Sequence, residues 1–170
     1  VPDAQVSQAY KFYIEFKSLT QDTRLMVDPY ARFLDMDYSQ NNSIIVDPSQ
    51  YEWHDADYHT PAIHELSIYE LHVHGFTQGD ADIETAHQGT YQGIIDRLEA
   101  GYFKDLGVTC LYMMPISEVP TPQGEDALGY NTSLFMSIER DFGTPDDLRR
   151  LVDTAHQQGL INNLLKKPLN

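Results

Sequence analysis

Three carboxylates that follow one apolar segment are the residues best suited to acid–base chemistry. Glu118, Glu125 and Asp126 come after 108–114, a near-continuous apolar run that ends before Pro115. A strand buried on both faces of a parallel sheet has this composition, and the loops after such strands are where parallel α/β folds place their active sites. Carboxyl groups there can act as general acids. An acidic protein also carries Glu and Asp on its loops for solubility, and we favour that interpretation here.

Four histidines form two candidate metal sites. His72 and His74 lie two residues apart in an alternating segment and would share one face of a strand, and His54 and His59 flank an acidic stretch. Paired imidazoles can bind a metal ion, but no third ligand follows at a recognised spacing. We therefore expect ordinary strand-face and loop histidines and predict no metal.

The cysteine and glycine patterns point away from several other chemistries. Cys110 is the only cysteine, which excludes an internal disulfide, and its apolar setting favours a buried thiol over a reactive one. The glycines form neither a dinucleotide fingerprint, nor a P-loop, nor a nucleophile elbow. We accordingly predict no cofactor.

The elements that must position these residues change in type along the chain. Segments 9–16 and 43–46 are predicted strands among turns, and 51–61 is an acidic, aromatic surface connector. Beyond it we predict a strand over 68–74, a loop over 77–89, a helix over 93–106, a strand over 108–114 and a helix from Thr144 to Gly159. Strands that alternate with helices in this way form βαβ units with a parallel sheet.

Composition narrows the range of partners. The 170 residues include 11 Lys and Arg against 26 Asp and Glu, a formal net charge of −15. Nucleic acids and anionic membranes are bound by concentrated positive charge, so neither is an expected partner. The first residues show no signal peptide, and no apolar run reaches the roughly 20 residues of a membrane helix. The expected location is the cytoplasm.

Five motifs occur in the order found in the α-amylase superfamily, which the chain resembles over about residues 25–160. They read IYELHV at 68–73 with FT at 76–77; GTY at 89–91 through LGVT at 106–109 and LYMMPI at 111–116; LGYN at 128–131; DFGTPDDL at 141–148; and AHQQGL at 155–160. Within that superfamily, DPYAR at 28–32 and IVDP at 45–48 resemble glycogen branching enzymes and maltooligosyl-trehalose trehalohydrolases.

The resemblance implies an α/β fold: a partial TIM (β/α)8 barrel, of which the first two βα units are present, preceded by the end of a β-sandwich domain. The expected domains are 1–62, the trailing part of the sandwich; 66–159, the incomplete barrel; and 160–170, a divergent tail. Two strands cannot close a barrel of eight. We therefore expect the second strand to have an unpaired edge through which the chain self-associates.

The family implies action on an α-1,4-glucan or maltooligosaccharide, by hydrolysis or by α-1,4 to α-1,6 transfer. Its Asp nucleophile and Glu general acid lie on later strands. The chain departs from the pattern at the third strand, where the family's Asp falls near Leu165. The resemblance thus predicts no catalytic residue here, and a chain that is inactive alone.

One residue carries over from the family's site, and one aromatic cluster suggests an alternative function. Tyr130 matches the tyrosine that stacks on the sugar beside the scissile bond, although it could also pack on the barrel rim. The alternative is a non-catalytic glucan-binding module, in which Trp53, with Tyr51 and Tyr58, forms a sugar-stacking platform. We favour instead that these three rings fill the seam between sandwich and barrel.

The last segment is predicted to stay outside the sheet. Asn162 and Asn163 stand at the centre of 160–170, and two lysines and a proline close it. A buried parallel strand is nearly all apolar, and each buried amide without a partner costs about 1–3 kcal/mol. We expect this tail to extend the preceding helix or to lie on the surface, away from the second strand.

Overall fold

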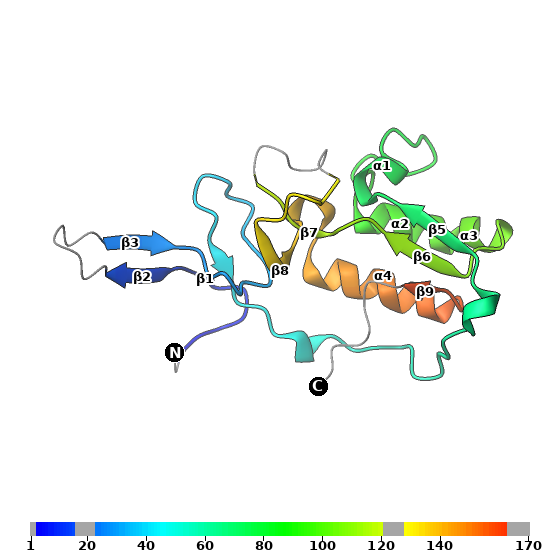
Figure 1. The fold of residues 1–170 in the computed structure, drawn as a ribbon, viewed down its shortest axis with the longest axis horizontal. Coiled ribbons are helices and arrows are strands. Elements are labelled where there is room, and N and C mark those ends of the chain that lie inside the picture. The colour runs from blue at the N-terminus through cyan, green and yellow to red at the C-terminus, as the bar shows by residue number, and fades with distance from the viewer. Residues whose placement is uncertain (1–2, 16–22, 121–127, 163–170) are drawn as a thin grey trace.

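The computed structural model describes residues 3–15, 23–120 and 128–162. They form an elongated molecule, with antiparallel strand pairs at one end and a parallel sheet with its helices at the other (Figure 1). The strands are β1 (Ala9–Tyr10), β2 (Phe12–Glu15), β3 (Thr23–Met26), β4 (Ser43–Ile44), β5 (Ile68–Leu71), β6 (Cys110–Met113), β7 (Ser117–Glu118), β8 (Leu134–Ile138) and β9 (Ile161–Asn162). The α-helices are α1 (Val73–Thr77), α2 (Tyr91–Glu99), α3 (Tyr102–Asp105) and α4 (Pro145–Gln157).

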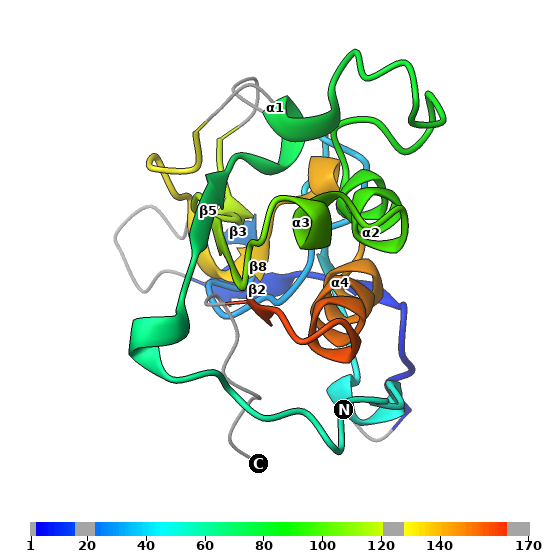
Figure 2. The same ribbon diagram turned by 90° about the vertical axis from the view of Figure 1, so that its right-hand side faces the viewer.

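A three-stranded parallel sheet in the order β5-β6-β9 organises the second part of the chain. Side chains alternate between its two faces, so Tyr69, Leu71, Leu111 and Met113 share one of them. The helices lie on one side of this sheet (Figure 2). On the opposite face Ile68 and Tyr112 are exposed, whereas Cys110 is buried.

The hydrophobic core lies between that sheet and helices α2, α3 and α4. Ile94, Ile95 and Leu98 of α2 are buried, as are Leu148 and Leu151 of α4. Their spacing of three and four residues places them on one stripe of each helix, as the sequence predicts. Burying an aliphatic side chain of this size contributes about 1.5–3 kcal/mol, so these stripes fix where each helix lies.

Local capping explains where the helices begin and end. Thr144 and Asp147 form a reciprocal capping box, with the Asp147 N–H donating to Thr144 Oγ1 over 3.2 Å. The predicted start of α4 is thus confirmed. The predicted helix over 93–106 is instead two helices, because Gly101 adopts a left-handed φ of 81° between α2 and α3. The apolar stripe continues across the break at Gly101, so the spacing of apolar residues in the sequence does not reveal the break.

The first part of the chain pairs differently from the prediction. Segment 9–16 is not one strand, because the chain leaves the ladder at Lys11: β1 pairs with β4, and β2 pairs with β3. The β2–β3 pair projects from one end of the molecule (Figure 1). Among the described residues before 62 these are two-stranded ladders. The β-sandwich and the boundary at 62 remain predictions.

The prediction for residues 160–170 is wrong at its start. β9 pairs in parallel with β6, with Ile161 opposite Cys110 and the Ile161 N–H donating to Thr109 O over 2.8 Å. The prediction weighed side-chain amides, but these bonds need only the backbone, and the buried Leu160 anchors the strand. The departure from the family's third strand therefore does not begin at 160. β6 is also paired on both sides, so the open edges belong to β5 and β9; residues 163–170 lie outside the described part.

Candidate functional site

A pocket of about 440 Å³ opens at the carboxyl end of β6. It is lined by Tyr112 and Met113 of that strand, by 115–117 after it, by Tyr130, by β8 and by Leu148 of α4. Parallel α/β sheets bind their ligands at this end of the strands. The pocket is therefore the candidate site of the described chain.

Tyr130 is held at the rim of this pocket by the glycine before it. Gly129 has a φ of 81°, and a Cβ built there would lie 2.1 Å from the Pro115 carbonyl oxygen. Only glycine permits the chain to pass this close to the end of β6. The Tyr130 side chain is 72% exposed, so its ring is available to a ligand. An aromatic face offers apolar contact to a pyranose, and the hydroxyl adds a hydrogen-bonding group.

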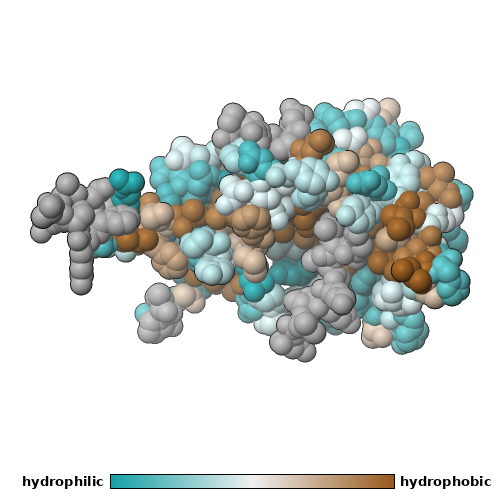
Figure 3. Space-filling view, in the orientation of Figure 1, coloured by the Kyte–Doolittle hydropathy of each residue, from teal (hydrophilic) through white to brown (hydrophobic). Residues whose placement is uncertain are grey.

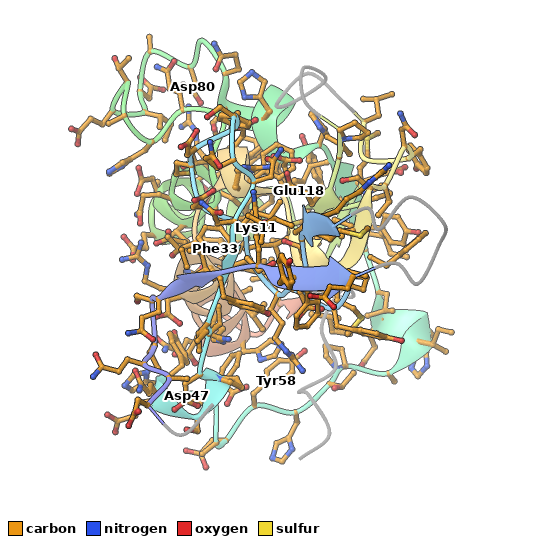
Figure 4. All side chains as sticks on the ribbon, turned by 90° about the vertical axis from the view of Figure 1, so that its left-hand side faces the viewer. Lys11, Phe33, Asp47, Tyr58, Asp80 and Glu118 are labelled. Carbon is orange, nitrogen blue, oxygen red and sulfur yellow. The ribbon has the colours of Figure 1, made fainter. Side chains whose placement is uncertain are left out.

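Glu118 is a buried structural group, which contradicts its interpretation as a surface carboxylate. It lies in β7, is 2% exposed, and accepts from Arg140 Nε over 2.9 Å. Figure 4 shows Glu118 among interior side chains, while Asp80 and Asp47 lie at the periphery. Burial raises the pKa of Glu118, and the Arg140 hydrogen bond partly offsets this. Glu125 and Asp126 lie outside the described residues.

Arg140 joins this carboxylate to the first part of the chain. Its Nη1 donates to the Asp35 carbonyl over 2.7 Å, its Nη2 donates to Asn41 Oδ1 over 2.7 Å, and its guanidinium lies 4.4 Å from the centre of the Tyr38 ring. The planar fork of arginine allows one side chain to bind these groups together. The β7–β8 pair, which lines the pocket, is thereby fixed to residues 35–41.

The histidines do not form the predicted arrangement. The strand ends at Leu71, and His72 Nδ1 accepts from the Gly75 N–H over 3.2 Å as the cap of α1, so His72 and His74 do not share a strand face. The structure places no cluster of three or more His, Cys, Asp or Glu side chains suited to a metal within residues 3–15, 23–120 and 128–162.

The connector 51–61 packs along α4. Asp153 of α4 is buried and accepts from the Tyr51 hydroxyl over 3.3 Å and from the His54 backbone N–H over 3.0 Å. Tyr58 stacks on His156, with ring centres 4.0 Å apart. Burial and the Asp153 charge raise the pKa of Tyr51 to about 12, so its hydroxyl remains a donor.

Trp53 and Cys110 complete the residues singled out in the sequence. Trp53 is half-buried and meets the Tyr51 ring edge-on, with ring centres 5.0 Å apart. It belongs to the connector that packs on α4, far along the chain from Tyr130. Cys110 is buried, as predicted, and burial raises the pKa of its thiol. A thiol with a raised pKa is a poor nucleophile.

A parallel sheet with helices against one face and a pocket at the carboxyl end of its middle strand is an arrangement found in the α/β barrel class of protein. Residues 48–162 match the family model described as alpha amylase, catalytic domain. The chain belongs to the α-amylase family.

Two curated relatives show the extent of the match. A malto-oligosyltrehalose trehalohydrolase from Deinococcus radiodurans is 36% identical over 133 residues, which are 78% of this chain and 20% of that protein. A 1,4-alpha-glucan branching enzyme GlgB from Cellvibrio japonicus is 34% identical over 166 residues, which are 94% of this chain and 21% of that protein. The chain thus spans about a fifth of the length of these relatives.

Solved structures agree on the fold. A putative alpha amylase from Salmonella typhimurium superposes with a TM-score of 0.68 at 29% identity, covering 82% of this chain and 21% of the other. The catalytic module of the glycogen-degrading pneumococcal virulence factor SpuA superposes with a TM-score of 0.66 at 22% identity, covering 91% and 26%, which supports the fold alone. In the described part of the chain, no helix has the length and apolar character needed to cross a membrane.

Proposed function

We propose that this chain is part of an α-glucan-active glycoside hydrolase or glucanotransferase of the branching-enzyme type, and that the Tyr130 pocket binds an α-1,4-glucan or maltooligosaccharide. One observation carries the proposal: an exposed tyrosine ring stands over a pocket at the carboxyl end of a buried parallel strand. An aromatic ring exposed to water is unfavourable, and stacking on the apolar face of a sugar removes that apolar surface from water.

The reaction of such enzymes needs two carboxyl groups that flank the glycosidic bond. One forms a glycosyl-enzyme and the other protonates the leaving oxygen and then activates water. The family places both on later strands, and no residue of this chain matches them. Glu118 is no substitute, because its carboxylate is buried against Arg140. We therefore propose that the 170-residue chain binds glucan without cleaving it.

Calorimetric titration of the chain with maltoheptaose tests the binding. Tyr130→Ala should weaken the affinity about tenfold, since it removes most of an apolar contact surface. Tyr13→Ala is the matched control: Tyr13 is 62% exposed on β2, outside the pocket, and its loss should change nothing. Wild-type chain that binds no maltoheptaose would refute the proposal.

Turnover is tested separately by chromatography of maltoheptaose incubated with the chain. We expect no shorter, longer or branched products. Product that appears with wild-type chain and disappears with Tyr130→Ala would overturn the proposed inactivity.

The glucan-binding module built on Trp53 makes a different prediction. Glycogen pull-down would then weaken in Trp53→Ala and remain unchanged in Tyr130→Ala. The contacts of Tyr51 and Tyr58 with α4 favour a packing role for this segment. We therefore expect Trp53→Ala to lower stability and leave glycogen binding intact.

A further inference from the structure

The β7–β8 pair contains an irregularity beside the pocket. Ser117 pairs with Ile138, whereas the next residue, Glu118, pairs with Leu134. Phe135, Met136 and Ser137 therefore lie between two pairs that are adjacent on β7. A bulge of this kind disrupts the ladder and redirects side chains, and bulges are enriched next to active sites.

Both ends of the bulge are fastened to one residue. The Glu118 carbonyl accepts from the Ser133 N–H over 2.8 Å, just before the bulge. The Glu118 carboxylate accepts from Arg140 Nε over 2.9 Å, just after it. Glu118 and Arg140 are both buried, so this clamp is shielded from water. The bulge is thus a built feature of the pair, and it supplies a role for the buried carboxylate.

The clamp presents apolar side chains to solvent. A regular strand would turn consecutive residues to opposite faces, yet Phe135 is 80% exposed and its neighbour Met136 is half-exposed, while Ser137 is buried. Both exposed residues line the pocket that Tyr130 borders. Figure 3 shows apolar areas on the middle of the molecule, where β8 lies. Phe135 and Tyr130 therefore give the pocket two exposed aromatic rings.

We propose that Phe135 is a second sugar-stacking residue of this site, which with Tyr130 binds neighbouring glucose units of one linear α-glucan. The inference rests on the proposed glucan binding and adds to it a minimum ligand length. Phenylalanine has no hydroxyl, so its contribution is apolar contact with a pyranose face. A ligand that reaches both rings gains over one that reaches only one.

Titration with glucose and maltoheptaose tests this assignment in the full 170-residue chain, because a single glucose unit can reach only one of the two rings. Wild-type chain should bind maltoheptaose at least tenfold more tightly than glucose. Phe135→Ala should remove most of this difference, by weakening the binding of maltoheptaose about tenfold and that of glucose much less. Phe135→Tyr keeps a ring and should retain the difference. Phe12→Ala, a half-exposed phenylalanine on β2, is the matched control and should leave both affinities unchanged.

The outcomes separate this inference from the proposal beneath it. If Tyr130→Ala weakens the binding of maltoheptaose but Phe135→Ala does not, the proposed glucan binding stands and the stacking role of Phe135 is refuted. The second ring is also refuted if Phe135→Ala weakens the binding of both sugars equally, or if Phe135→Tyr loses the difference in affinity while circular dichroism shows that it is folded. If wild-type chain binds neither sugar, both the inference and the proposed function fail.

Discussion

At the scale of single residues, Gly129 shows how one missing side chain places a functional ring. We predict that Gly129→Ala destabilises the chain by about 1–3 kcal/mol, because it adds left-handed strain and a contact of 2.1 Å with the Pro115 carbonyl. Urea unfolding measures this. Gly79→Ala is the control, since Gly79 has a φ of 75° but no atom within 4 Å of an added Cβ. An equal loss of unfolding free energy in the two variants would show that the close approach to Pro115 does not contribute to the destabilisation.

His54 makes the stability of the connector depend on pH. A hydrogen bond to Asp153 raises the pKa of His54 above its ordinary value of 6.5. The protonated form is favoured in the folded chain, so its contribution is fully present below pH 6.5 and is lost as pH rises through the raised pKa. We predict that His54→Gln lowers the urea midpoint below pH 6.5 and has less effect above the raised pKa.

The control for this prediction is His59→Gln, an exposed histidine in the same connector. Its midpoint should follow wild type at every pH. A stability difference between His54→Gln and wild type that stays constant across the range would contradict the role of the His54 charge.

At the scale of elements, the buried pair of Glu118 and Arg140 holds β7 and β8 together. We predict that Arg140→Leu costs about 3–5 kcal/mol, because it leaves a buried carboxylate unpaired. Adding Glu118→Met should restore part of the loss, since the charge is then removed. Equilibrium unfolding of the single and double variants measures both values.

Arg149→Leu provides the comparison. Arg149 pairs with the exposed Asp146 on the surface of α4, and its loss should cost less than about 1 kcal/mol. A double variant no more stable than Arg140→Leu alone would show that the unpaired carboxylate is not the source of the cost.

Elements whose signals are local could be predicted from the sequence. Strand β6 and the start of α4 follow from an apolar run and from Thr144 with Pro145. The strand predicted over 68–74 is too long, because the side chain of His72 caps α1 instead of continuing the alternation. Tyr130 was found through the family resemblance.

Features that depend on distant contacts could not be predicted in this way. The burial of Glu118 requires Arg140, 22 residues later, and no local pattern connects the two. Phe135 was missed because no strand was predicted over 134–138, the segment that forms the bulged β8. Its only signal is that Leu134, Phe135 and Met136 are three consecutive apolar residues.

At the scale of the whole molecule, the described sheet exposes apolar side chains on the face opposite its helices. Ile68 is 61% exposed there, in register with Cys110, and Tyr112 is also exposed. We predict that the chain self-associates through this face and the open edges of β5 and β9. The net charge of −15 opposes association, so roughly 1 M salt should increase it by screening.

Sedimentation velocity at low and high salt measures the association. Ile68→Lys should weaken it, whereas Ile63→Lys should not, since Ile63 is exposed in the short turn before β5. A compact monomer that unfolds cooperatively at both salt concentrations would refute the prediction.

The docking of the connector on α4 also bears on how the chain is made. Tyr51 and His54 donate hydrogen bonds to Asp153, and Asp55 accepts one from His156, so the partners lie 99 to 102 positions later in the chain. At the usual rate of synthesis, roughly 5–20 residues per second, α4 follows the connector from the ribosome by about 5–20 s. Throughout that interval the connector's aromatic rings lack their partner helix. The nascent chain therefore presents this segment to chaperones and proteases until α4 has been made.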